Sequence, residues 1–293
     1  MNNFTIKDIE NLSGIKAHTL RIWEKRYSII TPKRKESNHR FYDNEDLKQV
    51  LRITNLYNNG YKISAIANMN EDELLGYETT AVSAEGMLVN KLLEAALDLN
   101  EFLFNQTLDE AINISGLEAC MIKVVYPYLE KIGILWMKNE ALPAQERFAS
   151  NIIIKKMVNE IDKIESSFTN HQPSVILFTP PKEYHEIPLL FMYYLLKKNH
   201  QHVYYLGANV TLDVLDAFSK TNRSAFLYFH VITNLTHDNI DNYLLRLTNH
   251  FADQKIVMSG MLAKTVSIKA ENLQLLHSLE DMMSFGKGNF EPA

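Results

Sequence analysis

Apolar and polar residues follow three different patterns along the chain, and these patterns predict three domains. Residues 1–75 hold short amphipathic helices interrupted by a polar, proline-containing segment. Residues 76–168 are helical in pattern almost throughout, while residues 169–293 alternate short apolar runs with amphipathic helices. The expected fold is therefore a helix-turn-helix, a four-helix bundle and an α/β domain with a doubly wound parallel sheet of flavodoxin type.

Two short helices joined by a glycine are expected at the start of the chain. Thr5 can cap the first helix, over residues 6–12, with Asp8 three positions on, and Gly14 suits the left-handed turn that ends it. The second helix runs from about 16 to 27. This arrangement is typical of a helix-turn-helix, whose second helix enters the major groove of DNA.

The second helix has two distinct faces. Its apolar face carries Ala17, Leu20 and Trp23. Its other face carries His18, Arg21 and Lys25. The polar segment that follows, residues 30–43, ends in aromatic residues and is typical of a two-stranded wing, and two further helices are expected over 43–58 and 62–69.

Charge supports a polyanionic partner for this region. The chain has a formal net charge of −5, which excludes a globally basic coat protein, yet residues 14–42 carry eight basic and two acidic side chains. The single cysteine, Cys120, excludes a disulfide framework and a cysteine-based zinc site. A reducing, cytoplasmic location fits this cysteine content. Because no run of 18 apolar residues exists, no membrane partner is expected.

The N-terminal motifs resemble a known family. The run FTIKDIENLSGIKAHTLRIWEKRYSIITPKR, followed by NHRFYDNEDL, is similar to the winged helix-turn-helix of MerR-family regulators over residues 3–70. The resemblance implies double-stranded DNA with a palindromic operator as the partner, bound by a dimer or tetramer. Eight residues are expected to contact DNA: Lys16, His18, Arg21, Lys25, Arg26, Lys33, Lys35 and Arg40.

Helices in the middle domain are expected near 85–98, 100–114, 117–137 and 142–166, with Pro127 bending the third. The string IGILWMKNEALPAQERFAS resembles the helical module above the corrin in cobalamin-binding proteins, including the light-sensing MerR regulators of the CarH/LitR type. That resemblance implies that Trp136 covers the upper face of a corrin and that Glu146 helps to hold its upper ligand. Arg147 stands where those regulators have a histidine.

Strands of the last domain are expected at 175–179, 203–206, 225–232, 255–258 and 273–276. Ligands of such sheets bind beyond the carboxyl ends of the strands. The loop after the first strand, TPPKEYHEIP, places Glu183 two positions before His185. A carboxylate on one ring nitrogen leaves the other available to a metal.

This loop resembles the ExHxxG form of the cobalamin-binding motif. The resemblance implies that His185 is the lower cobalt ligand when a corrin is bound and that Glu183 matches the acid, with Pro188 in place of the glycine. Ser259 and Gly260 stand where the family has two glycines that make room for the nucleotide tail. Bulk at Tyr228 or His230, and at Ser259, is expected to fill that slot.

The leading hypothesis is a DNA-binding transcriptional regulator with a cobalamin-type sensor domain, for which the resemblance implies light acting through adenosylcobalamin. A second hypothesis is the same regulator with a degenerate corrin site that responds to another small molecule or a protein. A third is a corrinoid carrier or methyltransferase subunit. The basic winged helix argues against an enzyme, and no P-loop, GxSxG or HExxH motif occurs.

Overall fold

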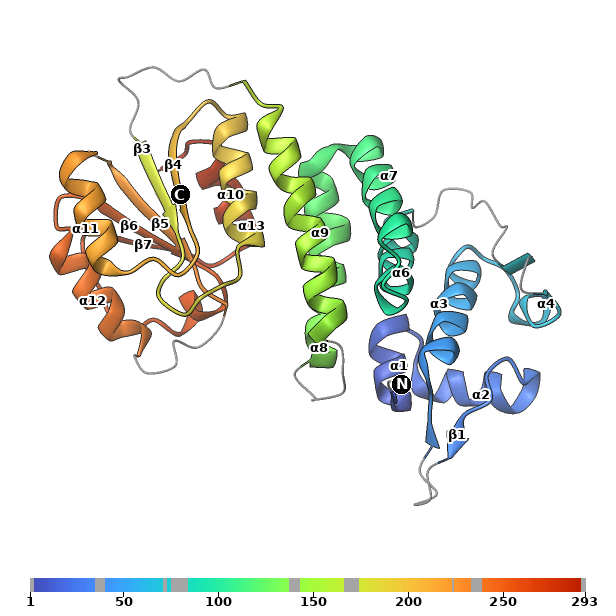
Figure 1. The fold of residues 1–293 in the computed structure, drawn as a ribbon. Coiled ribbons are helices and arrows are strands. Elements are labelled where there is room, and N and C mark those ends of the chain that lie inside the picture. The colour runs from blue at the N-terminus through green and yellow to red at the C-terminus, as the bar shows by residue number, and fades with distance from the viewer. Residues whose placement is uncertain are drawn as a thin grey trace. The chain divides into compact units, whose positions relative to one another are not determined.

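The computed structural model describes residues 3–34, 40–70, 73–74, 84–136, 143–165, 174–222, 224–232 and 239–290 (Figure 1). Their contacts divide the chain into two compact units, residues 1–152 and 153–293. The division at 75 and 168 into three domains stays a prediction. No helix of the described part is long and apolar enough to cross a membrane.

Unit 1 begins with the predicted pair of helices, α1 (Ile6–Ser13) and α2 (Ala17–Tyr27). Thr5 and Asp8 cap α1 reciprocally, and Gly14 ends it in the left-handed region at φ 79°. The wing strands β1 (Lys33–Arg34) and β2 (Arg40–Phe41) pair antiparallel. Two helices follow, α3 (Asn44–Asn58) and α4 (Ile63–Ile66).

Aromatic residues build the small core of this region. Trp23 is 3% exposed, and its ring meets the edge of Tyr57 at a centroid distance of 5.1 Å. Phe4 pairs with Tyr42 through an isolated antiparallel bridge, and both side chains are buried. These contacts join the first helices to the wing and to α3, so the orientation of α2 is fixed by packing.

The helical segments of the middle region are α6 (Ala84–Leu97), α7 (Glu101–Cys120), η1 (Met121–Val125), α8 (Tyr126–Trp136) and α9 (Pro143–Asp162). Gly116 leaves helical geometry at φ 77° and ψ 164°, where the sequence predicts a break. A π-helical turn, η1, lies directly before Pro127, and such turns accommodate irregular backbone hydrogen bonding.

Unit 2 contains a five-stranded parallel sheet in the order β4-β3-β5-β6-β7. Its strands are β3 (Ser174–Phe178), β4 (His202–Gly207), β5 (Phe226–His230), β6 (Lys255–Ser259) and β7 (Leu273–Leu276). In chain order this is 2-1-3-4-5, the flavodoxin-like arrangement that the sequence predicts. The switch point lies between β3 and β5.

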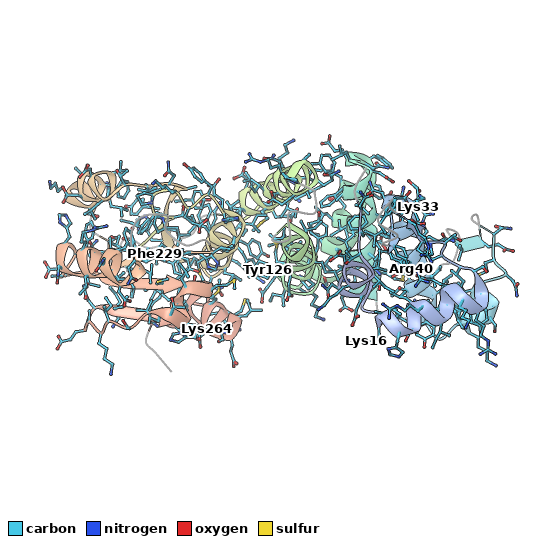
Figure 2. The ribbon with its side chains drawn as sticks, turned by 90° about the horizontal axis from the view of Figure 1, so that it is seen from below. Lys16, Lys33, Arg40, Tyr126, Phe229 and Lys264 are labelled. Carbon is cyan, nitrogen blue, oxygen red and sulfur yellow. The ribbon has the colours of Figure 1, made fainter. Side chains whose placement is uncertain are left out.

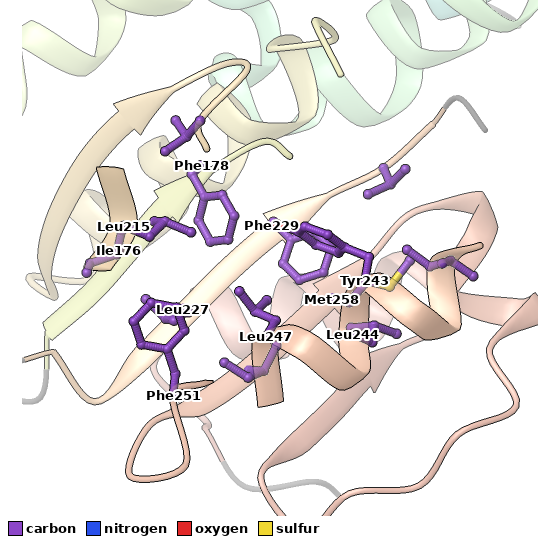
Figure 3. Close-up of a cluster of buried hydrophobic side chains, with 14 of the residues drawn as sticks. Ile176, Phe178, Leu215, Leu227, Phe229, Tyr243, Leu244, Leu247, Phe251 and Met258 are labelled. Carbon is purple, nitrogen blue, oxygen red and sulfur yellow. The ribbon is translucent and has the colours of Figure 1, made fainter. Parts of the chain in front are cut away.

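Helices cover both faces of the sheet (Figure 1). Two of them, α10 (Ile187–Lys198) and α13 (Leu279–Gly286), pack on one face. The helices α11 (Leu212–Thr221) and α12 (Ile240–His250) pack on the other, around Phe229 and Leu247 (Figure 3). The helix α13 and the short 3-10 helix η2 (Met261–Thr265) have no counterpart in the elements expected from the sequence.

Candidate functional site

The predicted polar face of α2 lies on the surface. His18, Arg21 and Lys25 are exposed, while Leu20 and Trp23 on the opposite side are buried. Arg26, one position beyond Lys25, is also exposed and lies over the ring of Tyr27 at 5.7 Å. The helix therefore presents a positively charged surface that is backed by a rigid core.

The wing is tied to α2 through an acidic residue. Glu24 accepts a hydrogen bond from the hydroxyl of Tyr42, and its carboxylate lies 3.8 Å from the guanidinium of Arg40. Burial, followed by the hydrogen bond to Glu24, raises the pKa of Tyr42. Arg40 is thus held beside α2, with 47% of its side chain exposed.

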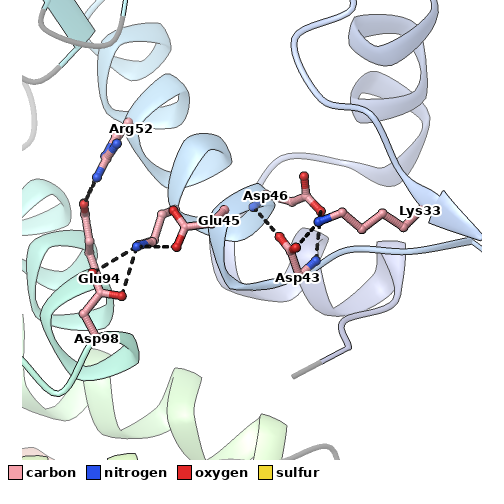
Figure 4. A network of polar contacts seen from close by, with 8 residues as sticks. Lys33, Asp43, Glu45, Asp46, Arg52, Glu94 and Asp98 are labelled. Carbon is pink, nitrogen blue, oxygen red and sulfur yellow. Dashed lines mark hydrogen bonds and ion pairs between the residues drawn. The ribbon is translucent and has the colours of Figure 1, made fainter. Parts of the chain in front are cut away.

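Two other predicted DNA contacts, Lys16 and Lys33 (labelled in Figure 2), have carboxylate partners, and those of Lys33 are drawn in Figure 4. Lys16 pairs with Glu10 at 3.0 Å. Lys33 is bonded to Asp43, and a second carboxylate, that of Asp46, lies 3.9 Å away. These partners reduce the charge that either lysine offers to phosphate. Lys35 lies outside the described residues.

Charged contacts join α3 to α6 of the bundle (Figure 4). Lys48 donates to both carboxylate oxygens of Asp98, at 2.9 and 3.0 Å, and Arg52 donates to Glu94 through Nε at 3.0 Å. Burial lowers the pKa of Lys48, but hydrogen bonds to Glu45 and Asp98 outweigh it and raise that pKa overall. Both cations belong to α3, so the bundle holds this helix by its charged face.

Two further hydrogen bonds join the N-terminal helices to the bundle. The amide of Asn90 donates to the side-chain oxygen of Asn55 at 2.7 Å. Lys131, on α8, donates to the backbone carbonyl of Leu12 near the end of α1. Burial lowers the pKa of Lys131. Sequence reasoning missed these residues because the partners are separated by 35 to 119 positions and no local motif marks them.

The residues expected above a corrin are only partly described. The helix α8 ends at Trp136, whose side chain lies outside the described part. Glu146, on α9, accepts a hydrogen bond from Ser150 at 3.1 Å, while Arg147 is exposed. Burial and, less strongly, the nearby charge of Glu146 raise the pKa of the fully buried Tyr128.

The loop after β3 brings its acid and its histidine together. Glu183 is fully buried, and its Oε1 lies 2.5 Å from Nδ1 of His185 and accepts the backbone N–H of His185 at 3.0 Å. Its Oε2 accepts the backbone N–H of Ile232, beyond β5, at 2.8 Å. One carboxylate therefore joins the two loops of the switch point and orients an imidazole whose side chain is 46% exposed.

This loop is fixed by further hydrogen bonds. The hydroxyl of Thr179 donates to the carbonyl of Glu183 at 2.5 Å and accepts the N–H of Asn209 at 3.0 Å. The side chain of Asn209 accepts the N–H of Lys182 at 2.8 Å, and both residues have left-handed backbones at φ 59° and 70°. The histidine thus projects from a loop that is already ordered.

Pro188 fits its position for a reason unrelated to a ligand. It stands in the first turn of α10, where its missing N–H leaves no helical hydrogen bond unmade. Glu186, which precedes this turn, accepts a hydrogen bond from Tyr205 at 3.0 Å. The proline therefore starts α10 directly after the histidine loop.

A buried hydrogen-bonded chain lies at the carboxyl ends of β5 and β6. Ser259 is fully buried, and its hydroxyl lies 2.6 Å from the hydroxyl of Tyr228 and 2.8 Å from Nδ1 of His230. Burial lowers the pKa of His230 to about 4, against the weaker opposing effect of Glu183. At Gly260, φ is +104°, and a Cβ would lie 2.2 Å from the carbonyl oxygen of Val231.

The donor set can be compared with the needs of a corrin. A neutral imidazole oriented by a carboxylate is a suitable metal ligand, so His185 would suit the cobalt of a corrin. On one face of the sheet, the ring of Tyr228 stacks on that of Phe285 with centroids 5.5 Å apart. On the other face, the ring centroids of Phe229 and Phe178 are 5.4 Å apart (Figure 3). A nucleotide tail that entered the core on either face would have to displace side chains of this kind.

Two parts of the chain match known domain families. Residues 4–73 match the model of the MerR HTH family regulatory proteins. Residues 88–158 match the model of the B12 binding domain. The first match covers α1 to α4 with the wing, and the second covers most of the bundle.

Relatives match over longer stretches. The HTH-type transcriptional repressor CarH of Myxococcus xanthus is 22% identical over 254 residues, which are 83% of this chain and 84% of that protein. CarA, an HTH-type transcriptional repressor from the same organism, is 26% identical over 217 residues, 72% of this chain and 70% of that one. The Methanosarcina barkeri monomethylamine corrinoid protein has a similar fold, with a TM-score of 0.54 at 14% identity, over 71% of this chain and 100% of that chain.

Proposed function

We propose that this chain, which joins a MerR-family helix-turn-helix to a B12-binding domain, is a DNA-binding transcriptional regulator controlled by a cobalamin. One observation carries the proposal. The chain has a helix-turn-helix whose second helix exposes a basic face. The same chain has a buried carboxylate that orients an imidazole at the switch point of a doubly wound sheet. A transcriptional regulator requires both, a surface that binds DNA and a site that binds a signalling ligand.

The DNA-binding step follows from α2 and the wing. The helix α2 enters the major groove, where Arg21 and Lys25 contact bases and phosphates. Arg40, on β2, contacts the phosphate backbone of the DNA. A palindromic operator requires two copies of the chain, because each copy reads one half-site. Self-association as a dimer or tetramer is accordingly part of the proposal.

The cobalamin step uses the loop after β3. His185 would hold the metal if a corrin is bound, and Glu183 would keep Nδ1 protonated so that the other ring nitrogen is a lone-pair donor. A bound adenosylcobalamin supplies a cobalt–carbon bond that light can break. Trp136 is proposed to cover the corrin, and Glu146 is proposed to help hold its upper ligand. Ser259 and Gly260 shape the end of β6.

The signal reaches DNA through the junction between the bundle and α3. Any repacking of α6 moves Glu94 and Asp98, which hold the charged face of α3. Because α3 packs with the core that orients α2, such a movement changes how the recognition helix meets the groove. We propose that this chain represses transcription, because CarH and CarA are named as transcriptional repressors.

A second candidate is the same regulator without a corrin. The buried chain of Tyr228, Ser259 and His230 favours it, because these side chains occupy the interior where a nucleotide tail would enter. In that case the signal is another small molecule or a protein. We regard catalysis as no part of the function, since a carrier or methyltransferase subunit has no use for a basic winged helix.

The function can be tested by selecting duplexes from a random pool with the full-length protein in the dark, with and without adenosylcobalamin. A palindromic consensus, bound with a steep salt dependence, supports the proposal. The mass of the complex in solution gives the number of copies per operator. Failure to enrich any sequence under both conditions overturns the DNA-binding assignment. Protein that shows no cobalamin absorbance after incubation with cobalamin and removal of the unbound cofactor favours the second candidate.

A further inference from the structure

The recognition helix carries an aliphatic side chain in the middle of its charged face. Ile22 is 52% exposed, although its neighbours Leu20 and Trp23 are buried at 1% and 3%. Helical residues advance by about 100° each. Ile22 therefore lies about 40° to one side of the line through His18, and Arg21 lies about 60° to the other side.

The neighbours of Ile22 on this face are all polar or charged. His18 and Thr19 precede it by one turn, and Lys25 and Arg26 follow it by one turn, so two of its four neighbours at i±3 and i±4 are cations and the other two are polar. Such a surface attracts a polyanion and repels another cationic face. A polyanion that covers this surface would also cover the apolar group on it.

The chemistry of the groove identifies what an isoleucine can contact. It has no donor or acceptor for the base edges, and the apolar group that the major groove offers is the C5-methyl of thymine. The β-branched side chain is also stiff, so little rotamer entropy is lost when it docks. We propose that Ile22 is a specificity-determining residue that reads a thymine methyl in each half-site of the operator.

This inference rests on the proposed DNA-binding function and is tested with the full-length protein. Duplexes are first selected from a random pool, and each thymine of the consensus is then replaced by deoxyuridine, which removes only the methyl group. At one thymine per half-site, the wild-type protein is expected to lose about three- to tenfold in affinity. In the Ile22→Ala variant, the same replacement is expected to have less than a twofold effect.

Two further variants make the result interpretable. Ile22→Val keeps the branched carbon and should retain most of the response to the methyl group. Ile114→Ala, at an aliphatic residue of α7 that is 65% exposed, should bind like the wild type. Melting followed by circular dichroism checks that each variant folds.

An equal deoxyuridine effect at every thymine in wild type and Ile22→Ala overturns the inference while leaving DNA binding intact. The same holds if Ile22→Ala selects the wild-type consensus without change. If the wild-type protein enriches no sequence, the proposed function itself fails, and the role of Ile22 fails with it.

Discussion

Lys48 on α3 and Asp98 at the end of α6 are 50 positions apart in sequence, yet the ammonium of the lysine is bonded to both oxygens of the carboxylate at 2.9 and 3.0 Å. The lysine side chain is only 9% exposed. A cation that is this deeply buried needs its partners, because an unpaired buried charge is strongly unfavourable. The pair therefore links the DNA-binding region to the bundle.

A double-mutant cycle measures this link. Lys48→Met and Asp98→Asn, singly and together, are expected to show a coupling of about 1 kcal/mol in the free energy of unfolding, more than a surface pair gives. Unfolding in urea can be followed by tryptophan emission, since Trp23 and Trp136 both belong to unit 1.

The pair Lys91–Glu110 is a matched control, because its side chains are 39% and 44% exposed. Its cycle should give no more than about 0.5 kcal/mol. Equal couplings in the two cycles would mean that Lys48 and Asp98 contribute no more than an ordinary surface pair.

Arg21 and Arg40 are expected to affect DNA binding in different ways. Arg21→Ala should lose about 1–3 kcal/mol on the selected duplex and relax the preference at one base pair, because the residue lies on the recognition face. Arg40→Ala should weaken binding to all sequences alike and lower the salt slope by about one.

Anisotropy titrations at several salt concentrations measure both effects. Lys123→Ala serves as the control, since this lysine is 57% exposed on η1 and outside the helix-turn-helix. Affinities that stay at the wild-type value in both arginine variants would contradict the recognition surface.

Much of the fold could be predicted from local patterns. The reciprocal cap of Thr5 and Asp8, the turn at Gly14 and the break at Gly116 all follow from backbone preferences that a few residues determine. The five strands follow from short apolar runs. The helix α13 was missed, although Ser278 and Asp281 form a capping box there, because it comes after the last expected strand.

The candidate site was predictable only where it is local. Glu183 and His185 stand two positions apart, so their hydrogen bond could be expected from the sequence. The contact of Glu183 with Ile232 could not, because it depends on the order of the strands. For the same reason, the exposure of Ile22 became informative only once the buried side of α2 was known.

His230 should make unit 2 sensitive to acid. Burial lowers its pKa from 6.5 to about 4, so as the pH falls through 6.5 the unfolded chain takes up a proton that the folded chain does not. The contribution of His230 to the free energy of unfolding is therefore fully present above pH 6.5. It is lost between pH 6.5 and pH 4, at up to about 1.4 kcal/mol per pH unit.

The variant His230→Gln retains a polar group for Ser259 but does not titrate, so its unfolding free energy should fall less over this pH range. NMR of labelled histidine rings measures the protonation directly. A ring of residue 230 that titrates near 6.5 in the folded protein would refute this expectation.

The filled interior around β5 and β6 predicts how a corrin is recognised. Because Tyr228, Phe229 and Ser259 are all fully buried, the nucleotide tail of cobalamin should contribute little to its affinity. Cobinamide, which lacks the nucleotide, is therefore expected to bind within about threefold of cobalamin, a difference below 1 kcal/mol. Absorbance titrations compare the two. A preference for cobalamin of a hundredfold or more would mean that the interior opens for the tail.

The account as a whole depends on corrin at His185 controlling DNA binding by α2. The most direct test is the affinity of the full-length protein for its selected duplex, measured by anisotropy in the dark with and without adenosylcobalamin, in the wild type and in His185→Ala. We expect the corrin to change the affinity of the wild type for the duplex by at least about tenfold, a typical coupling of more than 1 kcal/mol. The affinity of His185→Ala should be nearly the same with and without the corrin. Equal affinities with and without the corrin in the wild type, or an undiminished response in His185→Ala, would contradict this account.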